Sequence, residues 1–164
     1  MALRMMTALA LAAGLGLAVA GTAQAADPSP APTTPGGKAL VARQARFKEQ
    51  GATFKAINDE IRKDMPDKAA LAASAAKLNA LAADLPTWFP KGSGPETGLP
   101  TAARPEIWTD ADGFAAAAAK LQDETAKLAA ASTGGDMDAI KVQFRATAGA
   151  CKACHDKYRT PEQH

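Results

Sequence analysis

The clearest chemistry in this chain lies close to its C-terminus, in a C-x-x-C-H motif formed by Cys151, Cys154 and His155. In a helix, residues three and four positions apart share one face, so both thiols and the imidazole would point the same way. This spacing is typical of covalent haem attachment, in which two thioethers hold the macrocycle and the histidine ligates the iron. A disulfide between the two cysteines is the simpler outcome in an oxidising compartment.

The N-terminus carries the pattern of an export signal. Arg4 precedes an apolar run over residues 5–20, and Ala23-Gln24-Ala25 matches an A-x-A cleavage site. We expect residues 1–25 to form a signal peptide that is removed, which leaves a soluble exported protein. An uncleaved membrane anchor would need a longer apolar span of about 20 residues.

Composition and charge fit one globular domain. Of the 164 residues, 47% are hydrophobic and 22% are charged, unlike a disordered or fibrous chain. Signal cleavage removes one arginine and no acidic residue, which leaves 18 basic and 17 acidic side chains. This balance gives no reason to expect binding to nucleic acid or to a membrane surface.

A leader separates the signal from the fold. Residues 26–37 contain four prolines and end in two glycines, which predicts a flexible segment without helix. The folded domain is therefore expected to span residues 38–164.

Apolar residues at helical spacing predict two helices in the first half of this domain. The first helix ends before Pro66, and its buried face repeats every seven residues. The members of that stripe are Leu40, Phe47, Phe54 and Ile61. Asp67 is suited to cap a second helix, which Pro86 stops.

Residues 86–104 are rich in proline and glycine, which predicts a long irregular crossing loop. A third helix is expected to begin at a cap formed by Thr109 or Asp110 and to end at the glycines 134–135. A fourth helix follows Asp136 and carries the C-x-x-C-H motif on its inward face. The sequence therefore predicts an all-α protein, an antiparallel four-helix bundle with C-terminal haem attachment.

Several short motifs lie at specific places in this predicted bundle. They are Arg43-Gln44 with Phe47, Trp88-Phe89-Pro90 with Gly92-Ser93, Ala103-Arg104-Pro105-Glu106-Ile107-Trp108, and Cys151-Lys152-Ala153-Cys154-His155-Asp156 with Tyr158-Arg159. With these motifs the chain resembles the cytochromes c′, the four-helix-bundle branch of the c-type cytochromes, over about residues 38–160. The resemblance implies a periplasmic protein with one covalently bound haem c and five-coordinate iron. It also implies homodimers built through the first two helices and binding of nitric oxide and carbon monoxide.

The resemblance also assigns roles to individual residues. His155 is expected to be the proximal axial ligand of the haem iron, because the other histidine, His164, stands at the final position. Arg43 resembles the family residue near the haem propionates, and Arg159 the arginine that restricts the proximal side. The full set of expected haem-binding residues is Cys151 and Cys154, both covalent, with Arg43, Gln44, Phe47, Trp108, Tyr158 and Arg159.

The sixth iron position decides between gas binding and simple electron transfer. Low-spin relatives place a methionine in the first helix, where this chain has Phe47, which cannot ligate iron. The mature chain offers only Met65 and Met137, at predicted helix ends. We therefore expect an open iron under an aromatic lid that lacks a hydrogen-bond donor. No catalytic residue is assigned.

Other functions stay open at this stage. The first alternative is a low-spin, six-coordinate electron carrier, with Lys48 or Met65 as the sixth ligand. The others are a thiol-disulfide oxidoreductase that uses Cys151 and Cys154, and a helical binding module without haem. Basic residues of the fourth helix would suit an unidentified acidic redox partner, or only form a solvated face. They are Lys141, Arg145, Lys152 and Lys157.

Overall fold

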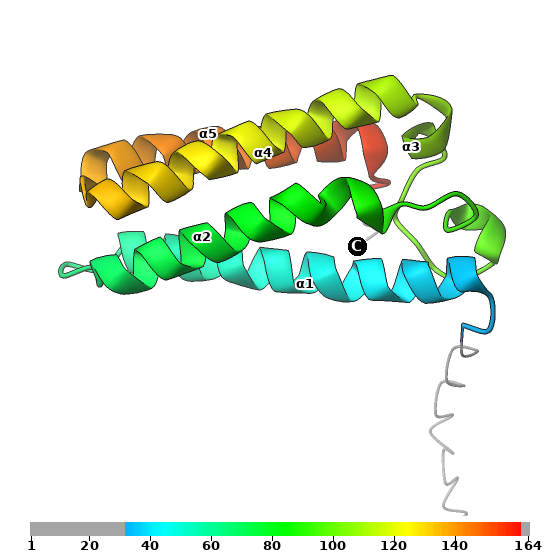
Figure 1. Ribbon diagram of the computed structural model, residues 1–164, viewed down its shortest axis with the longest axis horizontal. Coiled ribbons are helices and arrows are strands. Elements are labelled where there is room, and N and C mark those ends of the chain that lie inside the picture. Colours follow the sequence, from blue (N-terminus) through cyan, green and yellow to red (C-terminus); the bar gives the residue numbers. More distant parts are fainter. Residues whose placement is uncertain (1–31, 162–164) are drawn as a thin grey trace, which may run out of the picture.

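Four long helices build the protein. The computed structural model describes residues 32–161, so the predicted signal peptide, most of the leader and His164 lie outside the described residues. The helices are α1 (Pro35–Ile61), α2 (Lys68–Asp84), α4 (Ala111–Gly134) and α5 (Met137–Tyr158). They form an antiparallel bundle, as predicted (Figure 1).

The first helix begins earlier than the sequence suggested. The hydroxyl of Thr34 accepts a hydrogen bond from the backbone N–H of Gly37 at 3.0 Å, and Pro35 occupies the first turn. Proline is favourable there because its missing N–H has no partner inside the helix. A Cβ on Gly36 would lie 1.8 Å from the carbonyl oxygen of Gly92, so a close backbone approach requires this glycine. The prediction of a non-helical leader was therefore wrong for residues 35–37.

Aspartates cap the other three long helices. The carboxylate of Asp67 accepts from the N–H of Ala69 at 2.9 Å and from Ala70 at 3.0 Å, as predicted for α2. Asp110, rather than Thr109, caps α4.

The turn between α4 and α5 depends on local chemistry in the same way. Asp136 caps α5, because its carboxylate accepts from the N–H of Asp138 at 2.9 Å. Gly135 closes α4 in a left-handed conformation with φ 72°. Glycine adopts this conformation without a steric penalty, because it has no Cβ.

The crossing segment between α2 and α4 is more structured than predicted. It contains two 3-10 helices, η1 (Leu85–Trp88) and η2 (Pro95–Thr97), and the short helix α3 (Glu106–Thr109). A single antiparallel bridge joins Ala103 to Arg159, and no β-strand occurs in residues 32–161. The bridge holds the crossing segment beside the end of α5.

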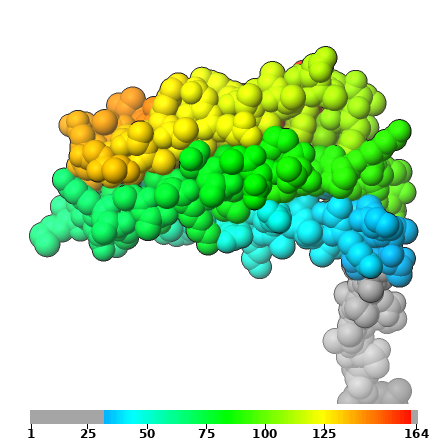
Figure 2. Space-filling view, in the orientation of Figure 1, coloured from blue at the N-terminus to red at the C-terminus, as the bar shows by residue number. Residues whose placement is uncertain are grey.

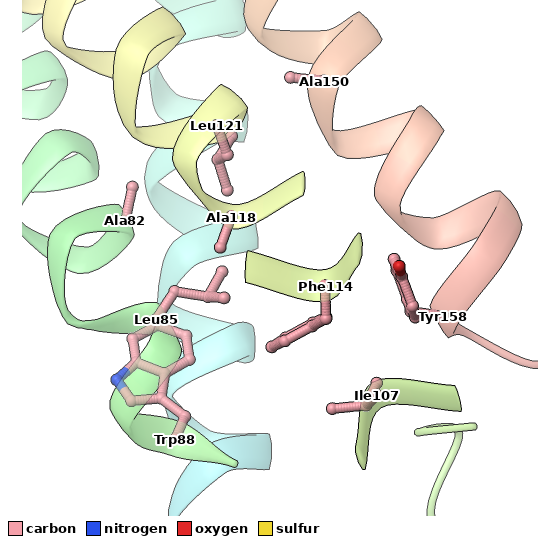
Figure 3. Packing of buried hydrophobic residues seen from close by; sticks show 9 residues of the cluster. All are labelled: Ala82, Leu85, Trp88, Ile107, Phe114, Ala118, Leu121, Ala150 and Tyr158. Atoms are coloured by element: carbon pink, nitrogen blue, oxygen red, sulfur yellow. The ribbon is translucent and has the colours of Figure 1, made fainter. Parts of the chain in front are cut away.

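The core has two parts along the bundle. Near the α1–α2 and α4–α5 turns, the buried residues are Ile57, Leu71, Ala75, Leu78, Leu128 and Ile140. At the opposite end they are Ala82, Leu85, Trp88, Ile107, Phe114, Ala118, Leu121, Ala150 and Tyr158 (Figure 3). Aromatic residues are gathered at this second end.

The long helices pack unevenly around the bundle. Packing is close between α1 and α2, between α2 and α4, and between α4 and α5, whereas α1 and α5 touch only sparsely. The space-filling view shows α2 closely packed against both α1 and α4 (Figure 2). The one open seam of the bundle therefore lies between its first and last helices. No helix in the part of the chain that the structure describes is both long and apolar enough to cross a membrane.

Candidate haem site

A cavity of about 840 Å³ lies between α1 and α5, at the aromatic end of the bundle. This volume falls within the range of about 300–1,000 Å³ that is usual for ligand pockets. Its wall is mostly apolar and comes from the long helices and the crossing segment. The apolar residues include Phe47, Phe54, Leu78, Leu85, Phe89, Ile107, Phe114 and Leu121.

The cavity brings together residues that are far apart in the sequence. Of the residues predicted to bind or ligate a haem, eight line it. They are Arg43, Gln44, Phe47, Cys151, Cys154, His155, Tyr158 and Arg159. The C-x-x-C-H motif therefore faces the α1 residues that the sequence had associated with it.

The motif occupies the last two turns of α5. Cys151 and Cys154 are half-buried free thiols, and burial raises the pKa of both. Reactive redox cysteines have a lowered pKa and commonly sit at helix N-termini, where the helix dipole stabilises the thiolate. Neither condition holds here, so the site does not resemble that of a thiol-disulfide oxidoreductase.

His155 lies beside the two thiols on the same wall. Desolvation lowers the pKa of its imidazole, and the positive charge of Arg159 lowers it further. The lower pKa favours the neutral form, which can ligate a metal. Residues 32–161 contain no cluster of three or more histidine, cysteine or acidic residues able to hold a bare metal ion.

A buried arginine stands at the α1 side of the cavity. The guanidinium of Arg43 donates to the hydroxyl of Ser93 at 3.0 Å and to the carbonyl of Ser93 at 2.9 Å. It also lies over the ring of Phe89, 4.6 Å from the centroid. Burial lowers the pKa of Arg43 from its usual value, and the nearby charge of Glu96 opposes that shift. Because Arg43 is only 3% exposed, its positive charge would complement a carboxylate that enters the cavity.

Comparisons with known proteins agree with this geometry. The family described as Cytochrome C' matches residues 38–159. The chain is 37% identical over 122 residues to a cytochrome c′ of Alcaligenes xylosoxydans xylosoxydans, which covers 74% of this chain and 92% of the relative. It is 38% identical over 124 residues to a cytochrome c′ of Rubrivivax gelatinosus, and the match covers 75% of this chain and 95% of that relative. The chain belongs to the cytochrome c′ family.

Solved structures extend the match to three dimensions. The crystal structure of cytochrome c′ from Rubrivivax gelatinosus superposes with a TM-score of 0.70 at 35% identity, covering 76% of this chain and 97% of that one. A mutant cytochrome c prime from Alcaligenes xylosoxidans, in complex with nitric oxide, gives a TM-score of 0.70 at 31% identity, covering 77% and 97%. Cytochromes c′ carry one covalently bound haem c, so this protein is a haem cytochrome.

The residues of the cavity fit that cofactor. An apolar wall matches the flat hydrophobic macrocycle, two thiols and an imidazole share one side, and a buried cation stands near the edge. Burial of a large apolar group would also fill the seam between α1 and α5, which the side chains leave open.

Phe47 lines the cavity on its α1 wall. Its ring packs edge-to-face with Trp88, at 5.1 Å between centroids, and with Phe89, at 5.9 Å. These contacts fix the ring through the crossing segment. Phe47 is therefore part of a preformed wall.

Tyr158 closes the other end of the cavity. Its hydroxyl donates to the carboxylate of Asp110 at 2.8 Å, and Lys157 pairs with the same carboxylate at 2.6 Å. These two partners lower the pKa of Asp110, with the Lys157 hydrogen bond as the larger cause. The contact ties the C-terminal turn of α5 to the first turn of α4.

Trp108 does not line the cavity, contrary to the prediction. Its indole N–H points to the carbonyl oxygens of Phe89 at 3.2 Å and Pro90 at 3.3 Å. Its ring packs edge-to-face against Phe89, which does line the cavity. Trp108 therefore supports the wall from behind.

Neither methionine of the predicted mature chain is near the cavity. Met65 is 87% exposed in the α1–α2 turn, and Met137 begins α5 and packs against the core cluster at that end. Both turns lie at the end of the bundle opposite the C-terminal turn of α5 (Figure 1). Lys48 does line the cavity.

Sequence reasoning missed several residues of the cavity. Leu85 and Leu121 line it, but in the sequence they are ordinary members of apolar stripes. Phe89 also lines it, although the sequence showed it only as part of the Trp88-Phe89-Pro90 motif. Gln50 also lines the cavity, and it shares a helical face with Phe47 and Phe54, but no sequence motif marks it.

Proposed function

We propose that this protein is a periplasmic mono-haem cytochrome with five-coordinate iron that binds nitric oxide and carbon monoxide. The composition of the cavity wall supports this proposal most directly. Among the described residues that line it, His155 is the single histidine and there is no methionine. The wall opposite His155 is instead occupied by Phe47, which has no lone pair to give to a metal.

In this proposal Cys151 and Cys154 form the thioethers to the haem, and His155 is the proximal iron ligand. When bound, the haem supplies an iron that can change oxidation state and accept one further ligand. The protein supplies the orientation, because the three residues come from consecutive turns of one helix and Tyr158 anchors the end of that helix to α4.

The remaining wall residues control access and charge. Arg43 offers a buried positive charge to the haem propionates, and Gln44, which donates to the carbonyl of Pro100 at 2.9 Å, stands beside it. Arg159 lines the cavity four residues after His155, in extended backbone just past the end of α5, and we assign it to the proximal side. Phe47 leaves room for diatomic ligands and hinders larger ones. We assign no catalytic residue.

Similar proteins support the ligands named here. Solved structures of cytochrome c prime variants from Alcaligenes xylosoxidans include a nitric oxide complex and a carbon monoxide complex, each 31% identical to this chain. Nitric oxide and carbon monoxide are both small enough to pass an aromatic side chain. Electron transfer to an unidentified redox partner remains a further part of this proposal.

Location and assembly are proposed from the sequence and the family. We propose a signal peptide over residues 1–25, then a leader that ends where α1 begins, and export to the periplasm. A homodimer would form through α1 and α2. Val41, 43% exposed on α1, provides apolar surface for that contact.

A six-coordinate electron carrier of the same fold is the alternative, and one observation favours it. Lys48 follows Phe47 and lines the cavity, so its amine could reach the iron if it lost its proton. The ordinary ammonium form of lysine has three N–H donors and no lone pair to give to a metal.

The optical spectrum of the reduced holoprotein, recorded with and without carbon monoxide, distinguishes these functions. An open iron gives a broad high-spin spectrum that sharpens when carbon monoxide binds. A sharp low-spin spectrum that does not respond would establish a filled sixth position and overturn the gas-binding proposal. A protein that shows no haem absorption after export would overturn both functions.

A further inference from the structure

One polar side chain on the cavity wall has no partner. Gln50 is 8% exposed and lines the cavity, and its Oε1 is shut off from solvent without a hydrogen bond to any described residue. Burial of an unpaired amide oxygen costs free energy, which a native fold normally recovers through some partner. An amide oxygen accepts hydrogen bonds, so a donor such as a water molecule would pair with it, whereas a diatomic ligand in the cavity would need the amide nitrogen of the same side chain.

The position of Gln50 on α1 indicates which part of the cavity it serves. It follows Phe47 by three residues and precedes Phe54 by four, and both phenylalanines line the same cavity. His155 belongs to the α5 wall. A small ligand bound opposite His155 would therefore approach the α1 wall, to which Phe47 and Gln50 both belong.

The chemistry of an amide suits such a ligand. A glutamine side chain carries one acceptor oxygen and a nitrogen with two donors, and half a turn about its last torsion exchanges the two with almost no change of shape. The donor end stabilises negative charge on the outer atom of a diatomic ligand, and the acceptor end can hold a water molecule. With the amide of Gln50 in this pocket, the distal side would contain a hydrogen-bond donor, whereas the sequence predicted an aromatic lid without one.

We propose that Gln50 is a specificity-determining residue of the gas pocket, whose side-chain amide hydrogen-bonds to the small ligand held on the α1 side of the haem. This inference rests on the proposed open iron and adds a polar contact that the sequence motifs do not contain. It predicts that the pocket binds polar diatomic ligands more tightly than it would if Phe47 were the only residue facing them.

The test uses carbon monoxide as the probe, on the reduced holoprotein. Loss of the amide in Gln50→Met should raise the C–O stretching frequency, because the donor no longer draws electron density toward the oxygen. The same change should speed carbon monoxide dissociation on the order of fivefold, as expected for one hydrogen bond. Methionine keeps the length of the side chain and suits a helix, so the bundle should fold.

Gln122→Met is the matched control. Gln122 donates to the carbonyl of Ala82 at 3.3 Å, away from the cavity, so its replacement should leave the C–O frequency unchanged. Equal frequencies and dissociation rates in the wild type and Gln50→Met would overturn the role of Gln50 while leaving the gas site intact. A wild-type spectrum that does not respond to carbon monoxide would overturn the open iron, and this inference with it.

Discussion

The guanidinium of Arg43 and the ring of Phe89 stack at 4.6 Å, so a residue of α1 and a residue of the crossing segment form one wall of the cavity. The same guanidinium donates to both oxygens of Ser93. The crossing segment is thus fastened to α1 by a buried charge, and the shape of the cavity depends on that contact.

Replacement of Arg43 should therefore destabilise the fold. In Arg43→Met the carbonyl of Ser93 loses its donor while it stays buried, which should lower the free energy of unfolding by about 1–3 kcal/mol. Urea denaturation monitored by circular dichroism measures this loss. Arg46→Met is the control, because the Arg46 side chain is 48% exposed and its ion pair with Asp84 is long, at 3.6 Å. Equal losses in the two variants would contradict a special role for the Arg43 contacts.

Phe47→Ala should open the α1 wall without loss of the covalent haem. Removal of the ring gives small ligands a wider approach, so carbon monoxide should bind faster, as measured by stopped-flow mixing with the reduced protein. Phe144→Ala makes the same truncation on α5, where Phe144 stacks with Phe54 at 4.3 Å and does not line the cavity. That control should lose stability but keep the wild-type association rate. An unchanged rate in Phe47→Ala would remove Phe47 from the ligand path.

Replacement of both cysteines should abolish covalent haem attachment. Cys151→Ala combined with Cys154→Ala leaves His155 in place but removes both thioethers, so acid-acetone extraction should release all haem from the protein. The bundle should also become less stable, because an unfilled cavity costs free energy. Either single variant should retain some covalent haem through the remaining thiol. Haem that resists extraction from the double variant would contradict attachment through these residues.

Glu124 should contribute to the pH dependence of stability. Glu124 is 5% exposed, and its carboxylate accepts hydrogen bonds from Lys120 and Gln143. Both hydrogen bonds lower its pKa in the folded state, and the one from Lys120 has the larger effect. Stability from this group is present above the unfolded pKa of about 4.3 and is lost as the pH falls through the lower folded value. Thermal melts of the wild type and Glu124→Gln should therefore differ at pH 7 and converge in acid.

Glu49→Gln is the control for that experiment. Glu49 is 48% exposed and pairs with Lys77 at the surface. Its replacement should change the melting temperature little at either pH. A difference between the wild type and Glu124→Gln that stays constant with pH would show that packing, not ionisation, explains the contribution of Glu124.

Local chemistry explains why much of this fold was predictable. The caps at Asp67 and Asp136 and the glycine turn at Gly135 depend on residues a few positions apart, so the sequence displays them directly. The start of α1 was misjudged because proline disfavours a helix interior but suits a first turn. The hydroxyl of Thr34 caps the helix just before Pro35, so this proline lies in the first turn.

The residues that the sequence misplaced depend on long-range contacts. Trp108 was expected at the haem as the last residue of the Ala103-to-Trp108 motif, but its indole N–H is held by the carbonyl oxygens of the crossing segment. Gln50 was overlooked because a single polar residue on an apolar helix face has no motif of its own. Burial and the absence of a partner became visible only once α1 faced α5.

The sparse contact between α1 and α5 has a consequence for how the chain reaches its native topology. Helices that are neighbours in sequence order dock closely on one another, so most of the bundle forms through contacts of low contact order. The remaining seam joins the two ends of the domain, where loop closure costs the most entropy. A cofactor bonded to α5 and packed on α1 would close that ring of helices, so the haem would contribute to folding as well as to ligand binding.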